Sequence, residues 1–66
     1  MTRREARQLW KLVERELTPK QRDALMACVV QGRRYSDVAR ERGVHRATVW
    51  RTVQRAKKRL RQAMEP

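Results

Sequence analysis

Seven lysine and arginine side chains, and no acidic ones, fall between Arg46 and Gln62. In this stretch valines at 49 and 53 repeat at the spacing of one helix face, so the positions between them lie on the opposite face. An arginine can grip guanine O6 and N7, a glutamine can grip adenine N6 and N7, and alanine or tryptophan can contact a thymine methyl group. The outward positions that offer these groups are Arg46, Ala47, Trp50, Arg51 and Gln54. The chemistry they make available is readout of base edges.

A second set of side chains surrounds these positions and is suited to phosphate. Contacts of this kind add affinity and salt dependence but do not select a sequence. The candidates are Arg33, Arg34, Tyr35, His45, Thr48, Arg55, Lys57, Lys58 and Arg59. Three alternatives stay open: Trp50 packs against the first helix or a second subunit, Tyr35 packs, and the basic cluster at 57–61 serves solubility.

The charge of the whole chain favours a polyanionic partner. Eighteen basic residues against seven acidic ones give a net charge of +11, and eleven of the bases lie between Arg33 and Arg61. A membrane surface is the other candidate, but it requires a continuous bulky apolar face with interfacial aromatics. No apolar run approaches the roughly 18 residues that a membrane span needs. We therefore expect a cytoplasmic, nucleoid-associated protein with no membrane partner.

Catalysis and metal binding are not expected. The chain has one histidine, one cysteine and one serine, with no pair spaced as a nucleophile and its base and no glycine-rich phosphate loop. Cys28 has no disulfide partner and, with only His45 beside it, cannot build a zinc site. We predict a packed thiol, no cofactor and no enzyme activity.

Hydrophobic periodicity and capping residues predict an all-α single domain over residues 1–66. A helix from 2 to 17 is followed by a three-helix unit, about 19–64, with helices starting at 18–19, 35 and 46. Thr2 with Glu5, and Thr18 with Gln21, have the form of capping boxes. Arg33 and Arg34 leave the helix that starts near Tyr35 with the weakest cap.

The first two helices each show an apolar stripe. In the second helix we expect Leu25, Cys28 and Val29 to face inward. The first helix carries more apolar bulk than a three-helix core requires, so residues 1–17 are the expected dimerisation element. The predicted contacts are Leu9, Trp10, Leu12 and Val13, with Leu60 and Met64 as the alternative surface.

Residues 35–53 meet the physical requirements of a helix-turn-helix. Ala39 is the small residue needed where two helices cross closely, and Gly43 permits the positive backbone angle of the turn. Val44 is expected to plug the turn from below. The next helix would bury Val49 and Val53 and present its other face.

With these residues in place, the chain resembles two families over about 45 of its 66 residues. The segment from Leu17-Thr-Pro-Lys-Gln-Arg to Arg61 resembles region four of bacterial sigma factors, which reads promoter DNA through a helix-turn-helix. The pattern Val-x-x-Gly-Arg…Ala-x-x-x-Gly-Val-x-Arg-x-x-Val is similar to the plasmid repressor KorA and its TrfB relatives, which are dimeric. The chain departs from both at Arg42, where an apolar residue is usual, and at His45, where serine or threonine usually caps.

These observations predict a sequence-specific duplex DNA-binding transcriptional regulator. The first hypothesis is a repressor that acts as a homodimer on a pseudopalindromic operator. The second is an adaptor, similar to sigma region four, that acts with RNA polymerase. The third is nonspecific nucleic-acid binding, including RNA.

Overall fold

The computed structural model describes residues 1–65, and every regular element within them is helical. The elements are α1 (Arg3–Glu16), α2 (Pro19–Leu25), the π-helical turn η1 (Met26–Val30), α3 (Tyr35–Arg42) and α4 (Arg46–Met64). Because η1 continues α2 without a break, the two form one helical stretch. The prediction of an all-α helix-turn-helix unit behind an N-terminal helix is confirmed.

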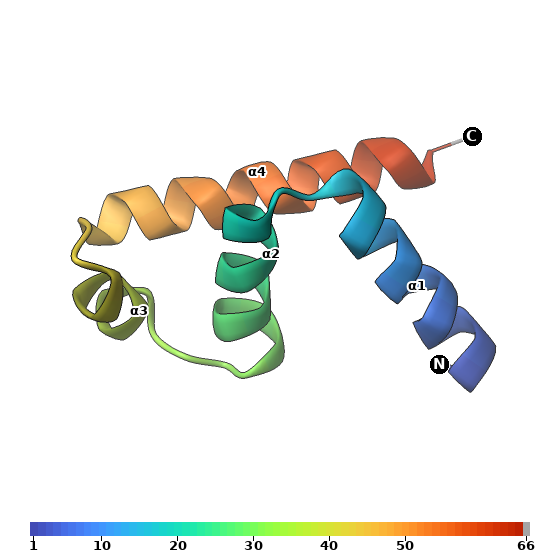
Figure 1. Ribbon diagram of the computed structural model, residues 1–66, viewed down its shortest axis with the longest axis horizontal. Coiled ribbons are helices and arrows are strands. Elements are labelled where there is room, and N and C mark those ends of the chain that lie inside the picture. Colours follow the sequence, from blue (N-terminus) through green and yellow to red (C-terminus); the bar gives the residue numbers. More distant parts are fainter. Residues whose placement is uncertain (66) are drawn as a thin grey trace.

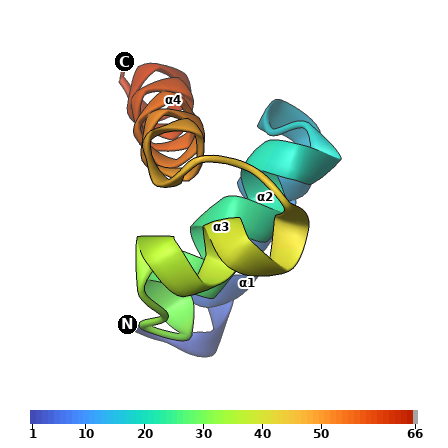
Figure 2. The ribbon, with the colours of Figure 1, turned by 90° about the vertical axis from the view of Figure 1, so that its left-hand side faces the viewer.

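Helix α4 is the element against which the others pack (Figure 1). The first turns of α4 lie over α3 and its middle lies over α2, and both helices contact it. Helix α1 approaches α4 at its own C-terminal end and diverges from it toward the N-terminus. In the view along α4, the other three helices occupy the same side of it (Figure 2). Much of the circumference of α4 is therefore left uncovered.

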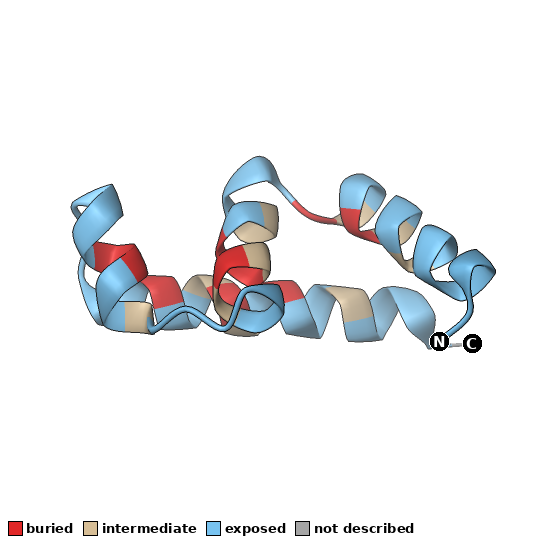
Figure 3. Ribbon diagram, turned by 90° about the horizontal axis from the view of Figure 1, so that it is seen from below, coloured by how far each residue is buried: buried red, intermediate tan, exposed pale blue. Residues whose placement is uncertain are grey.

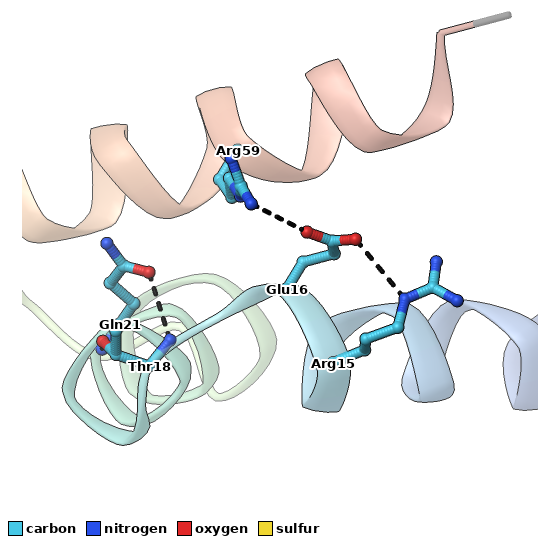
Figure 4. A network of polar contacts seen from close by, with 5 residues as sticks. All are labelled: Arg15, Glu16, Thr18, Gln21 and Arg59. Carbon is cyan, nitrogen blue, oxygen red and sulfur yellow. Dashed lines mark hydrogen bonds and ion pairs between the residues drawn. The ribbon is translucent and has the colours of Figure 1, made fainter.

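Polar contacts fix the ends of the first two helices (Figure 4). The backbone N–H of Gln21 donates to the Thr18 hydroxyl, and the Thr18 N–H donates to the Gln21 side chain, both at 3.2 Å, so this predicted capping box is confirmed. At Thr2 the hydroxyl accepts from the Glu5 N–H, but the Glu5 carboxylate binds that hydroxyl instead of the Thr2 backbone, so only half of the predicted box forms. As expected, no side chain caps α3.

The core is small and aliphatic (Figure 3). Val38 and Val53 are its largest fully buried side chains, and no polar or charged residue among residues 1–65 is buried. The buried residues are Val13, Leu17, Ala24, Leu25, Ala27, Val38, Ala39, Val49, Val53 and Ala56. Four of these ten are alanines, which lets the helix backbones approach closely. The stability of the fold therefore depends on few side chains.

The helical stretch formed by α2 and η1 faces the core with Ala24, Leu25 and Ala27. The i→i+5 bond from the Gln31 N–H to the Met26 carbonyl, 3.0 Å, winds the backbone through less than the usual angle per residue. Ala27 is 6% exposed and belongs to the core, whereas Val29 is 50% exposed. The expectation that Val29 faces inward, which assumed a regular α-helix, is wrong. Cys28 packs at the edge of the core as predicted.

The turn between α3 and α4 is a Schellman motif. Gly43 adopts a left-handed conformation with φ +64°, and the Val44 N–H donates to the Ala39 carbonyl at 3.0 Å. Val44 does not plug this turn as expected, because it is 42% exposed. Ala39 already fills the crossing beneath the turn, and Val44 lies at the rim beside Ala24 and Val49.

Gly43→Ala is expected to destabilise the domain by about 1–2 kcal/mol, the cost of a left-handed conformation for a residue with a Cβ. No heavy atom lies within 4 Å of the added Cβ, so the cost arises from the backbone alone. Gly43→Asn should cost less, because asparagine tolerates this region. Urea unfolding measures both variants, and equal stability of Gly43→Ala and the wild type would contradict this account of the turn.

Candidate nucleic-acid interface

Helix α4 separates an inward face from an outward face. Val49, Val53 and Ala56 are at most 3% exposed and hold the helix against α2 and α3. The predicted base-reading side chains lie on the remaining surface of its first turns. Arg46, Trp50 and Arg51 are exposed, and Ala47 and Gln54 are half-buried.

The start of α3 lies beside the start of α4. Tyr35, the first residue of α3, is half-buried and packs against the core. It lines a shallow depression together with Arg46, Ala47 and Trp50. Trp50 therefore lies beside α3, and no residue of α1 lines this depression.

His45 caps α4 in place of the serine or threonine that is usual in a helix-turn-helix. Its Nδ1 accepts a hydrogen bond from the Ala47 N–H at 3.1 Å, so the cap requires an unprotonated Nδ1. In this tautomer the proton is on Nε2, which is a hydrogen-bond donor. Because the His45 side chain is exposed, that donor is accessible to an acceptor such as a phosphate oxygen.

The predicted phosphate-binding cations differ in their surroundings. Arg33 pairs with Glu41, and Arg59 Nη2 lies 3.2 Å from a Glu16 carboxylate oxygen, so both have a partner within the chain (Figure 4 for Arg59). Two other candidates line hollows: Tyr35 lies beside α4, and Lys57 borders an apolar groove. Six of the predicted phosphate contacts are exposed and take part in no ion pair of residues 1–65: Arg34, His45, Thr48, Arg55, Lys57 and Lys58.

Two basic residues that the sequence analysis did not select lie near the outward face of α4. Lys20, from the start of α2, and Arg42, from the end of α3, line one shallow hollow with Thr48 and Thr52 of α4. They come from separate helices, so spacing in the sequence gives no signal for them. The acidic side chain of Asp23 lines the same hollow.

An apolar groove lies between α1, η1 and the C-terminal half of α4. Of the seven exposed large hydrophobic side chains among residues 1–65, five line it: Met1, Trp10, Val29, Val30 and Met64. Val29 and Val30 were not predicted for this surface, because Val29 was expected to face inward and Val30 to lie around it. Of the predicted dimerisation residues, Leu9 and Trp10 line this groove with an accessible surface, whereas Val13 is only 6% exposed. Val13 belongs to the core and also lines the groove, so the predicted dimer contacts stay a prediction.

Cys28 is the titratable group whose pKa is clearly shifted by its surroundings. Partial burial raises the pKa of its thiol, and the positive charges of Arg42 and Arg33 oppose that effect. Burial dominates, so the thiol stays protonated at neutral pH. Residues 1–65 contain no group of three potential metal ligands and no helix long and apolar enough to cross a membrane.

A short helix, a left-handed glycine turn and a following helix with a buried valine face and a basic outer face define a helix-turn-helix DNA-binding domain. The family model described as sigma-70, region 4 matches residues 7–60. The chain belongs to this family. Comparison with curated proteins gave no match, and comparison with solved structures gave none either. The likeness to plasmid repressors is not shown by these comparisons.

Proposed function

We propose that this protein binds duplex DNA sequence-specifically and regulates transcription, with the first turns of α4 in the major groove. One observation carries the proposal. Val49 and Val53 are buried, which leaves Arg46 and Arg51 exposed on a stretch, 46–62, that contains no acidic residue. A helix of this kind fits the major groove and attracts the phosphates that flank it.

The roles of individual side chains follow from their exposure and partners. Arg46, Arg51 and Gln54 are assigned to base edges, and Ala47 and Trp50 to apolar base contacts. Phosphate contacts are assigned to exposed cations, hydroxyls and the His45 Nε2 donor. They are Arg34, Tyr35, His45, Thr48, Arg55 and Lys58, with Lys20 and Arg42 added, whereas Lys57 lines the apolar groove and is assigned to the contact proposed there. Arg33 and Arg59 would first have to leave Glu41 and Glu16, so we assign them to the fold.

Selection of preferred duplexes from a random pool tests this proposal. We expect a defined motif whose binding survives an excess of random DNA at physiological salt. Uniform binding to all duplexes, or to RNA equally, would support nonspecific nucleic-acid binding instead. A pseudopalindromic motif with half-sites about 34 Å apart would indicate a dimer.

We further propose that the protein acts as a homodimeric repressor, whose occupation of an operator excludes polymerase, and that the apolar groove forms the dimer interface. The solvent-accessible surface of the chain is larger than that of a compact monomer of the same mass, which supports a partner that covers part of it. A compact monomer of 8.0 kDa exposes about 4,500 Å², whereas this chain exposes 5459 Å². The excess, on the order of 1,000 Å², is similar to the roughly 800 Å² that each partner buries in a standard interface.

The charges at the groove favour a second copy of the chain as that partner. Glu14 lies one turn after Trp10 on the same side of α1, and Lys57 and Arg61 line the opposite wall. A two-fold contact brings the same patch of both copies together. It can therefore place the carboxylate of one copy opposite the cations of the other, beside the exposed valines of η1 that the contact would bury.

Val30→Asp is expected to convert the dimer into a monomer, because it places an unpaired charge in the apolar interface. The loss should be about 100-fold in dimer affinity, corresponding to about 2.7 kcal/mol. Gln31→Asp is the matched control: it adds the same charge one residue away, outside the groove. Molar mass from light scattering, with circular dichroism as a check on folding, measures both variants. A wild-type chain that stays monomeric at high concentration and on DNA would contradict the dimer.

The family membership of the chain favours a second candidate function, an adaptor that acts with RNA polymerase. Sigma-70 region 4 is part of a polymerase-associated factor, and its model covers residues 7–60 here. In that case the purified chain would bind the selected duplex weakly, and polymerase would restore tight binding. In either case the ligand is chromosomal or plasmid DNA, so we place the protein in the cytoplasm with the nucleoid.

A further inference from the structure

Trp50 is a large apolar side chain exposed on a surface that is otherwise rich in basic residues. It is 50% exposed, and apart from the rim residue Val44 it is the one large hydrophobic side chain among residues 1–65 that is strongly exposed outside the apolar groove. An exposed indole on the face assigned to DNA is costly in water. Its position indicates that a ligand covers it.

The surroundings of Trp50 form a small, mixed site. Tyr35, Arg46, Ala47 and Trp50 line the depression, so it combines two aromatic side chains, one methyl group and one guanidinium. Three of the side chains come from the first two turns of α4, the part of a helix-turn-helix that meets base edges, and Tyr35 is the first residue of α3 beside them. The site thus offers apolar contact on the reading surface itself.

A thymine methyl group is the ligand that this chemistry fits. In the major groove the C5-methyl group of thymine is the apolar feature that distinguishes one base pair from the others. Phosphate oxygens would gain from Arg46 but not from the two aromatic rings or the alanine. A guanidinium beside an apolar site also matches the edge of a neighbouring base, such as guanine O6 and N7.

We propose that Tyr35, Ala47 and Trp50 form a specificity site for one thymine methyl group, next to a base held by Arg46. This inference rests on the proposed function, since it concerns the same reading surface. It adds a defined atom of the DNA as the ligand and assigns α3 a part in base selection through Tyr35.

Replacement of thymine by deoxyuridine tests the site, because it removes the methyl group and keeps every hydrogen-bonding atom of the base. Each thymine of the selected duplex is replaced singly, and dissociation constants are measured by fluorescence anisotropy. One position in each half-site should lose about fourfold in affinity, the effect of leaving one methyl group unburied. The Trp50→Ala variant should bind the duplex with thymine and the duplex with deoxyuridine at that position with equal affinity.

Two control variants separate methyl contact from general binding. Tyr35→Phe keeps the ring and should retain the deoxyuridine effect, which excludes a hydroxyl–phosphate contact as its cause. Lys58→Ala, which is exposed and far along α4, should weaken binding and also retain the effect. Trp50→Ala should keep its helical circular dichroism, since the side chain lies outside the core.

The outcomes distinguish this inference from the function on which it rests. If the wild type binds its selected duplex specifically but tolerates deoxyuridine at every position, or if the selected motif contains no thymine, the methyl site is wrong and DNA reading stands. If Trp50→Ala leaves the deoxyuridine effect unchanged, the methyl group is read elsewhere and the assignment to Trp50 falls. Failure to select any duplex would overturn the proposed function itself.

Discussion

Val53→Asp is expected to unfold the protein at 25 °C. Val53 is 0% exposed, on the face of α4 that α2 and α3 cover. An aspartate there would be an unpaired charge among aliphatic side chains, with a cost of about 3–5 kcal/mol. Marginal stability of about 0.05–0.15 kcal/mol per residue gives a domain of this length only about 3–10 kcal/mol in total. Its thin core places it toward the low end of that range.

Far-UV circular dichroism with urea titration measures this effect, and Gln62→Asp is the control. Gln62 is exposed on the same helix, so its replacement adds the same charge without burying it. We expect that variant to stay within about 0.5 kcal/mol of the wild type. If Val53→Asp unfolds at the same urea concentration as Gln62→Asp, α4 does not bury its valines as described here.

Arg51→Ala and Lys58→Ala are expected to weaken DNA binding in different ways. The two residues are exposed and seven positions apart, so they lie on the same face of α4, two turns from one another. Arg51 belongs to the turns assigned to base edges. Its loss should cost about 1–3 kcal/mol, or about 5- to 150-fold in affinity, and should relax the preference at one base pair. Lys58 is assigned to phosphate, so its loss should weaken binding to all sequences alike.

Competition with single-base variants of the selected duplex, repeated over a range of salt concentrations, separates the two effects. For Lys58→Ala the slope of log affinity against log salt should fall by about one, with base preferences unchanged. For Arg51→Ala the preference at one position should disappear. Identical behaviour of the two variants across all sequences would show that reading and anchoring residues are not divided along α4 as proposed.

The features that the sequence predicted well depend on local chemistry. The bounds of α3 and α4 matched expectation because Tyr35–Arg42 ends at a left-handed glycine and α4 begins directly after a capping residue. The Thr18 capping box formed because both partners lie within one turn. Val49 and Val53 were buried because their spacing leaves them on one face of a regular helix.

The features that the sequence analysis missed depend on tertiary contacts. The π-helical turn of η1 has no signature in Met26–Val30, and from this stretch the core takes Ala27 whereas Val29 and Val30 stay exposed. The apolar groove then followed, since its walls come from α1, η1 and α4. The ion pairs that occupy Arg33 and Arg59 were also missed, because Glu41 and Glu16 lie far from them in the sequence and only folding brings them close.

The ratio of two dissociation constants tests most directly whether α4 reads DNA. The selected duplex and a scrambled duplex of the same composition are titrated with purified protein at about 0.15 M salt, where nonspecific electrostatic attraction is partly screened. We predict that the selected duplex binds tighter by on the order of 10³-fold, as in specific protein–DNA complexes. Equal constants for the two duplexes, both weakening in parallel as salt rises, would contradict sequence reading by this helix.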